Sequence, residues 1–329
     1  MNNYKNILLI NFGGIGDEIL FSPVATALKN TYPDAKITLC LESRSKAFIN
    51  LTNCIDSYFF ADIKTKNKYF EMLKLYFRAL FGKYDLVISS GANNLISLML
   101  FLTGIKTRVG YKTSPKSEKF LTHAVTLNKN QYASLMYFDL VKPVVNSEYK
   151  LPEIKVEECE KIENSVLIHP GVSKISVSKK IIKTITAKQW AELIKEILKK
   201  GKDVYFAGGP DDAECISQIK EELRTVDSAN FHDMYGETKN IYELAKLIKR
   251  SEVLICSDSA PMHIGVATNT KTIAVFGPTD DKILLPVSDK FFAITNDTPC
   301  RPCLWEKRQQ TCDKLDCLNI DLTKILKLV

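Results

Sequence analysis

Short apolar runs alternate with longer amphipathic segments along the whole chain, and the alternation restarts once near the middle. In the first half the apolar runs lie at residues 6–11, 36–41, 85–90, 107–111 and 123–127, with helical patterns at 23–32 and 93–104. In the second half they lie at 165–171, 203–210, 253–258 and 272–278, each followed by a helical pattern. Strands that alternate with helices form parallel sheets through right-handed crossovers. The pattern therefore predicts an α/β protein with two Rossmann-like domains that face a central cleft.

The junction between the two blocks is expected at residues 142–161, where two prolines and mixed charges interrupt the periodicity. We therefore predict an N-terminal domain at 1–155 and a C-terminal domain at 156–329, a division that suits a chain of 329 residues. No apolar run is long enough to span a bilayer, and the first residues lack the layout of a signal peptide. These features predict a cytoplasmic protein.

The excess positive charge lies in the first half of the chain. Residues 1–155 contain 20 Lys and Arg against 12 Asp and Glu, whereas residues 156–329 contain 25 against 26. An acidic partner of the first half is therefore expected, either nucleic acid, an anionic membrane surface or a phosphorylated glycolipid. A Lys-rich surface without a partner would explain the same excess.

The first apolar run leads into NFGGIGDEIL (residues 11–20), a glycine turn followed by a helix. The stretch contains neither the G-x-G-x-x-G fingerprint nor a Walker lysine. Asp17 lies near the N-terminus of the next helix, where the helix dipole stabilises a negative charge. A carboxylate kept ionised beside a ligand can act as a general base for a hydroxyl group. An ordinary acid of the first helical turn is the alternative interpretation.

Polar motifs follow the strands of the second half, where parallel sheets bind their ligands. In CSDSAPMH (residues 256–263), Pro261 suits the first turn of a helix whose free backbone amides would face a diphosphate. His263 lies one turn further along, and a buried structural histidine is the alternative. Lys183 precedes a helix capped by Thr186 and could reach a phosphate, although a solvated lysine would give the same pattern.

Taken in order, these motifs resemble glycosyltransferase family 9, the ADP-heptose:lipopolysaccharide heptosyltransferases, whose fold is the two-domain GT-B type. In the first half the matching segments are Gly16-Asp17, RVGY (108–111) and LTH (121–123). In the second half they are HPG with its following serine (169–173), KTITAKQW (183–190), GGPDDAE (208–214), GETKNIYELAKLI (236–248), DSAPMH (258–263) and FGPTD (276–280). The resemblance covers nearly the whole chain.

The resemblance implies an inverting transferase that moves a heptose from ADP-heptose to a hydroxyl group of a lipopolysaccharide core, or of a related glycan or protein. Asp17 would be the general base, and no cofactor would be required for catalysis. The N-terminal domain would bind a phosphorylated glycolipid or glycan acceptor and no nucleic acid, and the C-terminal domain the ADP-sugar donor. A sugar-nucleotide epimerase of similar fold and a non-catalytic sugar-nucleotide-binding protein are the alternatives.

The donor-binding residues that the resemblance implies all lie in the second half of the chain. They are Gly171, Ser173, Lys183, Glu214, Lys239, Asp258, Ser259, Ala260 and His263. Lys179 and Lys180 are alternatives to Lys183 as the contact to the diphosphate, because the loop before the helix is longer than usual. Ala260 stands where the family has glycine.

Four of the nine cysteines, Cys300, Cys303, Cys312 and Cys317, lie near the C-terminus with the spacing C-x2-C-x8-C-x4-C. Nine cysteines in a cytosolic chain argue against a disulfide framework. Four thiolates can form a tetrahedral metal site, and some relatives within the resembled family bind zinc or iron in such a segment. Any bound metal would be structural, since four sulfur ligands leave no open position. Reduced thiols in a surface loop are the alternative.

The segment KNKYFEMLKLYFRALFGKYD (residues 66–85) has apolar residues at helical spacing. They are Tyr69, Phe70, Leu73, Phe77, Leu80 and Phe81, and they are flanked by Lys66, Lys68, Lys74, Arg78 and Lys83 against the single acid Glu71 before Asp85. A basic, aromatic-rich amphipathic helix can lie in a membrane interface. This interpretation predicts a protein that is peripheral on the inner membrane. A helix packed on its own sheet, with solvated lysines, is the alternative.

Overall fold

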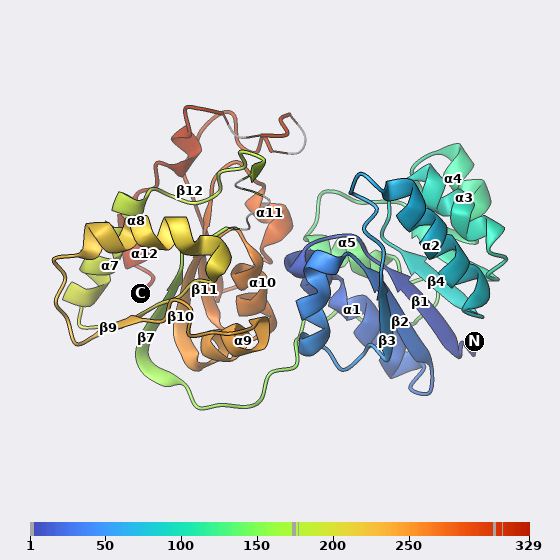
Figure 1. The fold of residues 1–329 in the computed structure, drawn as a ribbon, viewed down its shortest axis with the longest axis horizontal. Coiled ribbons are helices and arrows are strands. Elements are labelled where there is room, and N and C mark those ends of the chain that lie inside the picture. The colour runs from blue at the N-terminus through green and yellow to red at the C-terminus, as the bar shows by residue number, and fades with distance from the viewer. Residues whose placement is uncertain (1–2, 173–175, 177, 305–306, 311) are drawn as a thin grey trace. The chain divides into compact units, whose positions relative to one another are not determined.

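The structure, a computed structural model, describes residues 3–172, 176, 178–304, 307–310 and 312–329 (Figure 1). The chain divides into two compact units, Met1–Lys155 and Val156–Val329. Each unit contains one six-stranded sheet, and every strand pairing in both sheets is parallel. The prediction of an α/β fold with two Rossmann-like parallel sheets is confirmed.

In the first unit the strand order is β3-β2-β1-β4-β5-β6. The strands are β1 (Asn6–Ile10), β2 (Lys36–Leu41), β3 (Ser57–Phe60), β4 (Leu86–Ser89), β5 (Thr107–Tyr111) and β6 (His123–Val125). The helices are α1 (Ile15–Thr31), the 3-10 helix η1 (Ser43–Leu51), α2 (Lys68–Phe81), α3 (Asn94–Leu102), α4 (Pro115–Phe120) and α5 (Ala133–Asp139). The strand order reverses between β1 and β4, and open parallel sheets bind ligands beyond the carboxyl ends of the strands at that point.

In the second unit the strand order is β12-β11-β10-β7-β8-β9. When its strands are numbered from β7 and the order is read from the β9 edge, this is the same topology as in the first unit. The strands are β7 (Ile162–His169), β8 (Asp203–Phe206), β9 (Phe231–Asp233), β10 (Ser251–Ser257), β11 (Lys271–Phe276) and β12 (Phe291–Thr295). The helical elements are α7 (Ala187–Lys199), η2 (Pro210–Asp212), α8 (Ala213–Leu223), α9 (Ile241–Arg250), α10 (Ala260–Ala267), α11 (Asp281–Leu284), η3 (Asp316–Leu318) and α12 (Leu322–Leu326). The order reverses between β7 and β10, so the ligand-binding edge is expected there.

Three strands that the apolar runs did not predict are β3, β9 and β12. All three lie at the edges of their sheets, and each has partly exposed positions along its length. The central strands β1 and β10, in contrast, are buried at most positions. Strands that are covered on both faces form continuous apolar runs, which are easier to recognise in a sequence than the partly exposed segments of these three edge strands.

Helix α1 begins at Ile15, directly after the glycine turn, so Asp17 lies in its first turn as predicted. The apolar helical pattern at 23–32 covers only its second half. Pro23 therefore lies inside the helix, where it cannot donate to the carbonyl of Ile19. The hydroxyl of Ser22 donates to that carbonyl instead, at 2.7 Å. The helix thus continues past the proline. No described helix has the length and apolar content that crossing a membrane requires.

Candidate functional site

The glycine turn after β1 places Asp17 in the first turn of α1. The Asp17 carboxylate accepts a hydrogen bond from the backbone N–H of Gly14 through Oδ2, at 2.7 Å. A Cβ at position 13 would lie 2.2 Å from the Cβ of Asp17, so this close approach requires glycine. Within the part of the chain that the structure describes, the second oxygen of this half-buried carboxylate makes no hydrogen bond. Asp17 therefore caps its helix with one carboxylate oxygen.

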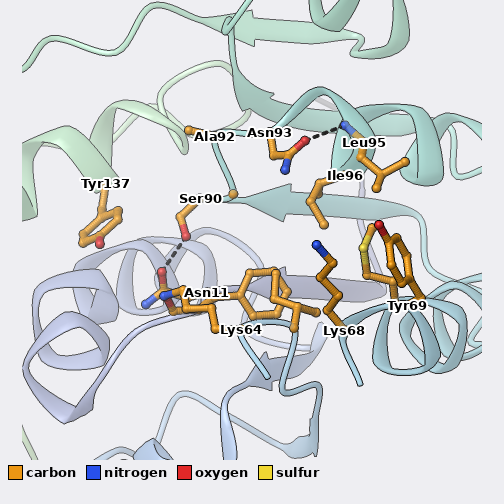
Figure 2. A pocket seen from close by; sticks show the side chains of 14 residues that line it. Asn11, Lys64, Lys68, Tyr69, Ser90, Ala92, Asn93, Leu95, Ile96 and Tyr137 are labelled. Atoms are coloured by element: carbon orange, nitrogen blue, oxygen red, sulfur yellow. Dashed lines mark hydrogen bonds between the residues drawn. The ribbon is translucent and has the colours of Figure 1, made fainter. Parts of the chain in front are cut away.

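A cavity of about 380 Å³ lies at the switch point of the first sheet (Figure 2). Asn11 follows β1, Ser90 and Asn93 follow β4, and Lys64 and Lys68 lie before and at the start of α2; all five line the cavity. The Ser90 hydroxyl donates to Asn11 Oδ1 at 2.5 Å, which joins the ends of the two central strands. The cavity thus combines neutral hydrogen-bonding groups with two ammonium groups.

Asp17 does not line this cavity, but it lies next to Asn11 and Tyr137, which do line it. The side-chain amide of Asn11 donates to the backbone carbonyl of Asp17 at 3.4 Å. Burial raises the pKa of the Tyr137 phenol well above its ordinary value, and the charge of Asp17 acts in the same direction. Asp17 therefore lies at the border of the cavity, near Asn11 and Tyr137.

A second acid, Glu18, is fully buried behind the turn. Burial raises its pKa well above the ordinary value, and the charges of Asp17 and Glu42 also raise it. These effects favour the protonated form of Glu18. Glu42 is itself buried and accepts from Arg44 Nε at 2.5 Å, while Lys64 Nζ lies 3.5 Å from Glu42 Oε1. The Glu42 carboxylate and the carbonyl of Phe12, which accepts from Lys64 Nζ at 2.5 Å, thus hold Lys64 at the wall of the cavity.

In the second unit, Asp258 follows β10 and is 2% exposed. Its Oδ2 accepts hydrogen bonds from Lys183 Nζ at 3.0 Å and from Thr279 Oγ1 at 2.7 Å. Burial alone would raise the pKa of Asp258, but the ammonium of Lys183, the hydrogen bond from Thr279 and the charge of His263 lower it below the ordinary value. The structure therefore brings Lys183, Asp258 and His263 together and holds Asp258 as an anion. The sequence did not single out Thr279, although it lies in FGPTD.

The HPG turn after β7 is fixed to the same edge of the sheet by hydroxyl groups. The carbonyl of Pro170 accepts from Ser257 Oγ at 2.7 Å and from Thr184 Oγ1 at 2.8 Å. The indole N–H of Trp190 donates to Thr184 Oγ1 at 2.9 Å. Thr186 caps α7 through the backbone N–H of Gln189, so the predicted cap is confirmed. These bonds connect the ends of β7 and β10 to the start of α7.

Gly171 packs directly against the Asp212 carboxylate, and we expect Gly171→Ala to lower the free energy of unfolding by about 1–3 kcal/mol, a typical cost of overpacking. An added Cβ would lie 1.8 Å from Asp212 Oδ1. Asp212 would have to turn away and lose the hydrogen bond that it accepts from the Gly209 N–H at 2.9 Å. Urea unfolding measures the change. Gly209→Ala is the matched control, because its added Cβ would lie 3.9 Å from Asp212, and equal effects of the two variants would contradict this packing argument.

The other expected donor residues have less defined surroundings. Ser259 and Ala260 are half-buried at the start of α10, and Glu214 lies in the first turn of α8. Glu214 lines a cavity of about 1050 Å³ together with apolar residues such as Val172 and Ile182. Lys239 is exposed and its backbone N–H donates to Glu243 at 2.7 Å, as part of the cap of α9.

Of the three candidate lysines, Lys183 makes the ion pair described above, whereas Lys179 and Lys180 are exposed. Ser173 lies outside the described residues.

The cysteine segment does not form the expected tetrahedral site. Among the described residues, no group of three or more His, Cys, Asp or Glu side chains is arranged to hold a metal ion. Cys303 and Cys317 are buried, whereas Cys300 is exposed. Burial raises the pKa of the Cys317 thiol to about 11, and nearby Cys300, Cys303 and Cys312 also raise it. The four thiols thus share one region without the geometry of a metal site.

Comparisons with known proteins point to one family. The family model described as glycosyltransferase family 9 (heptosyltransferase) matches residues 73–314. Lipopolysaccharide heptosyltransferase 3 of Escherichia coli is 26% identical over 300 residues, which cover 83% of this chain and 84% of that protein.

Two solved structures resemble the fold. The glycosyl transferase family 9 structure from Veillonella parvula has a TM-score of 0.76 at 20% identity and covers 99% of this chain and 96% of that one. The E. coli heptosyltransferase WaaC, solved with ADP-2-deoxy-2-fluoro heptose, has a TM-score of 0.67 at 16% identity and covers 90% and 94%.

Proposed function

Because this chain belongs to glycosyltransferase family 9 (heptosyltransferase) and is a heptose-transferring glycosyltransferase, we propose that it moves the sugar from ADP-heptose to a hydroxyl group of a phosphorylated glycan or glycolipid. The first unit binds the acceptor and the second binds the donor in this proposal. The WaaC structure with an ADP-sugar analogue supports the choice of donor. Family membership identifies a transferase, so the epimerase and the non-catalytic binding protein are not retained.

The observation that carries the donor assignment is the Lys183–Asp258 pair beside the N-terminus of α10. Backbone N–H groups at a helix start favour a diphosphate, and an ammonium adds a point charge. In our proposal the Asp258 carboxylate holds Lys183 in place, while the helix start at Ser259 and Ala260 and the turn at Gly171 receive the diphosphate. Stabilising the charge that develops on departing ADP is the catalytic role of such groups.

Further donor contacts are assigned by analogy with the resembled motifs. The Glu214 carboxylate would accept hydrogen bonds from the ribose hydroxyls within the cavity that it lines. His263 would shape the diphosphate site from inside α10, where it is 6% exposed. Ser173 and Lys239 complete the proposed set.

The acceptor assignment rests on the cavity of the first unit. Lys64 and Lys68 would neutralise a phosphate group, and Asn11, Ser90 and Asn93 would bind sugar hydroxyls. Asp17 would remove the proton from the attacking hydroxyl group as its oxygen bonds to the anomeric carbon and the bond to ADP breaks. Attack from the face opposite ADP inverts the configuration.

The donor is tested by the thermal stability of the protein with a panel of sugar nucleotides. A ligand that binds only the folded state stabilises it by about 2.7 kcal/mol at a hundred times its Kd. We expect ADP-heptose to raise the Tm most, ADP less, and UDP- and GDP-sugars little. A larger shift with a UDP- or GDP-sugar would replace the proposed donor by that nucleotide class.

A structural metal at the four cysteines is a separate part of the proposal, and it requires their sulfur atoms to adopt an arrangement that the described residues do not have. We expect about one zinc or iron per chain, because a tetrahedral S4 site takes one ion of either kind. Elemental analysis of protein purified without a metal-affinity column measures the content. Cys300→Ser with Cys303→Ser should abolish it, and Cys54→Ser with Cys159→Ser is the control. Metal-free wild-type protein with four titratable thiols in this segment would refute the site.

A further inference from the structure

Helices α2 and α3 expose large apolar side chains on one side of the first unit. On α2 these are Tyr69, Phe70, Leu73, Phe77 and Phe81, with Phe70 67% and Phe81 72% exposed. On α3 they are Leu95, Phe101 and Leu102. The two helices lie side by side (Figure 1), and most of the large apolar side chains exposed in the described residues belong to them. We call this set of eight residues the α2–α3 face.

The core of the unit does not account for this face. Helix α2 buries Leu75 and Ala79 against Ile96 and Leu100 of α3 and the strands beneath them. The interpretation of α2 as a helix packed on its own sheet explains why Leu75 and Ala79 are buried. It does not explain the five exposed aromatic and leucine side chains of α2, which remain in contact with water. Exposed apolar patches of this kind mark surfaces that bind a protein or a membrane.

The charges around the face select between these partners. Residues 64–83 contain six Lys and Arg and one acid, Glu71, which pairs with Lys74 at 3.3 Å. Helix α3 contains no charged residue. In a two-fold dimer through this face, the basic rim of one copy would meet the basic rim of the other, and like charges across an interface are unfavourable. An anionic bilayer, in contrast, accepts both the aromatic side chains and the positive rim.

We propose that the α2–α3 face docks this protein on an anionic membrane surface. Phe70, Phe77 and Phe81 would enter the interface between headgroups and acyl chains, while Lys66 and Arg78 would contact lipid phosphates. The acceptor cavity borders this face, because Tyr69 and Leu95 belong to both and Lys68 lines the cavity beside them. If the proposed function is correct, docking therefore brings the cavity to the headgroups of a lipid-linked acceptor. The docking itself does not depend on that function.

Co-sedimentation with vesicles tests the proposal. We expect the wild-type protein to bind phosphatidylcholine vesicles that contain phosphatidylglycerol, to bind pure phosphatidylcholine poorly, and to dissociate as salt rises. Lys66→Glu with Arg78→Glu should weaken binding at least about tenfold, since each basic residue near an anionic surface contributes roughly fivefold. Phe70→Ser with Phe81→Ser should weaken it on the same vesicles by a similar factor. None of these four residues lines the acceptor cavity.

Matched controls change exposed residues of the same kinds outside the face. Leu151→Ser with Val287→Ser controls for lost apolar surface, and Lys188→Glu with Arg224→Glu for reversed charge; all four residues are exposed. These variants should bind vesicles like the wild type, and thermal melts should show that every variant is folded. Equal vesicle binding by the face variants and the controls would overturn the proposal.

Two further measurements separate this proposal from its competitors. Light scattering that shows a wild-type dimer dissociated by Phe70→Ser with Phe81→Ser, without vesicle binding, would make the face a self-association surface instead. Transfer to a water-soluble acceptor should be unchanged in the face variants. Loss of vesicle binding with intact transfer supports docking, whereas absent transfer in the wild type would count against the proposed function alone.

Discussion

Replacing Asp17 with asparagine is expected to lower the rate of sugar transfer by about 10²–10⁴-fold, the usual cost of removing a general base. The change is close to isosteric, and the amide oxygen can still accept the hydrogen bond from the Gly14 N–H. The glycine turn and the start of α1 should therefore keep their geometry. Only the capacity to take a proton is lost. Steady-state kinetics with ADP-heptose and a phosphorylated acceptor measure the effect.

The affinity for the donor distinguishes this role from a general loss of structure. Asp17 lies in the first unit, and the groups proposed to hold the donor lie in the second, so titration with ADP should give the same Kd in the variant. Asp34→Asn, at an exposed position of the same unit, is the control. Wild-type turnover in Asp17→Asn would remove this carboxylate from the mechanism.

Asp258→Asn is expected to lower the free energy of unfolding by about 3–5 kcal/mol, the range for breaking a buried ion pair by removal of one charge. Lys183 is 15% exposed in its side chain, and it would lose its counter-charge while remaining largely buried. The asparagine can still accept from Thr279, so the loss is mainly electrostatic. Donor affinity should fall as well, because Lys183 would no longer be held.

The pKa shift of Asp258 determines how the stability difference between wild type and Asp258→Asn changes with pH. The folded state lowers the pKa of Asp258 below its ordinary value of about 3.9, so the stabilisation is complete above that value and is lost as the pH falls through the folded pKa. The difference between wild type and Asp258→Asn should be full at neutral pH and narrow below about pH 4. Urea unfolding between neutral pH and pH 3 measures it. Asp227→Asn, at an exposed position, should show no such difference, and a constant gap down to pH 3 would contradict the ion-pair account.

The sequence predicts the fold well where burial alone decides it. The central strands β1 and β10 are covered on both faces, and their apolar runs are visible without a structure. The edge strands β3, β9 and β12 are partly exposed, and their segments SYFF, FHD and FFAIT were not distinguished from the loops around them. The helix after the glycine turn was predicted with Asp17 near its start, although the apolar pattern was recognised only from Pro23 onward. The helix passes through Pro23 because Ser22 donates to the carbonyl that the proline leaves without a donor.

The site divides in the same way. Asp17, Lys183 and Asp258 could be proposed from the sequence because each lies in a recognisable motif near the end of a strand or the start of a helix. Asn11, Lys64 and Thr279 were missed, because their roles depend on which distant strand or loop lies beside them. Asn11 meets Ser90 only because β4 pairs with β1, and Thr279 meets Asp258 only because β11 pairs with β10.

The cysteine spacing predicts a metal site, and elemental analysis is needed to decide it, because spacing along the chain does not fix where four sulfur atoms lie and no such cluster is found among the described residues. For the aromatic residues of α2, the sequence predicted the helix correctly but not which of its sides is exposed. Their helical spacing was plain in the sequence, but periodicity alone could not distinguish a buried stripe from an exposed one. In the structure α2 has both.

The proposed inverting transfer is tested by mass spectrometry and NMR of the products formed from ADP-heptose with and without a phosphorylated glycan acceptor. We expect ADP and a glycan heavier by one heptose, linked with inverted anomeric configuration, and no conversion of ADP-heptose when the acceptor is omitted. Retention of the anomeric configuration in the product, or conversion of ADP-heptose to an epimer without any acceptor, would contradict it.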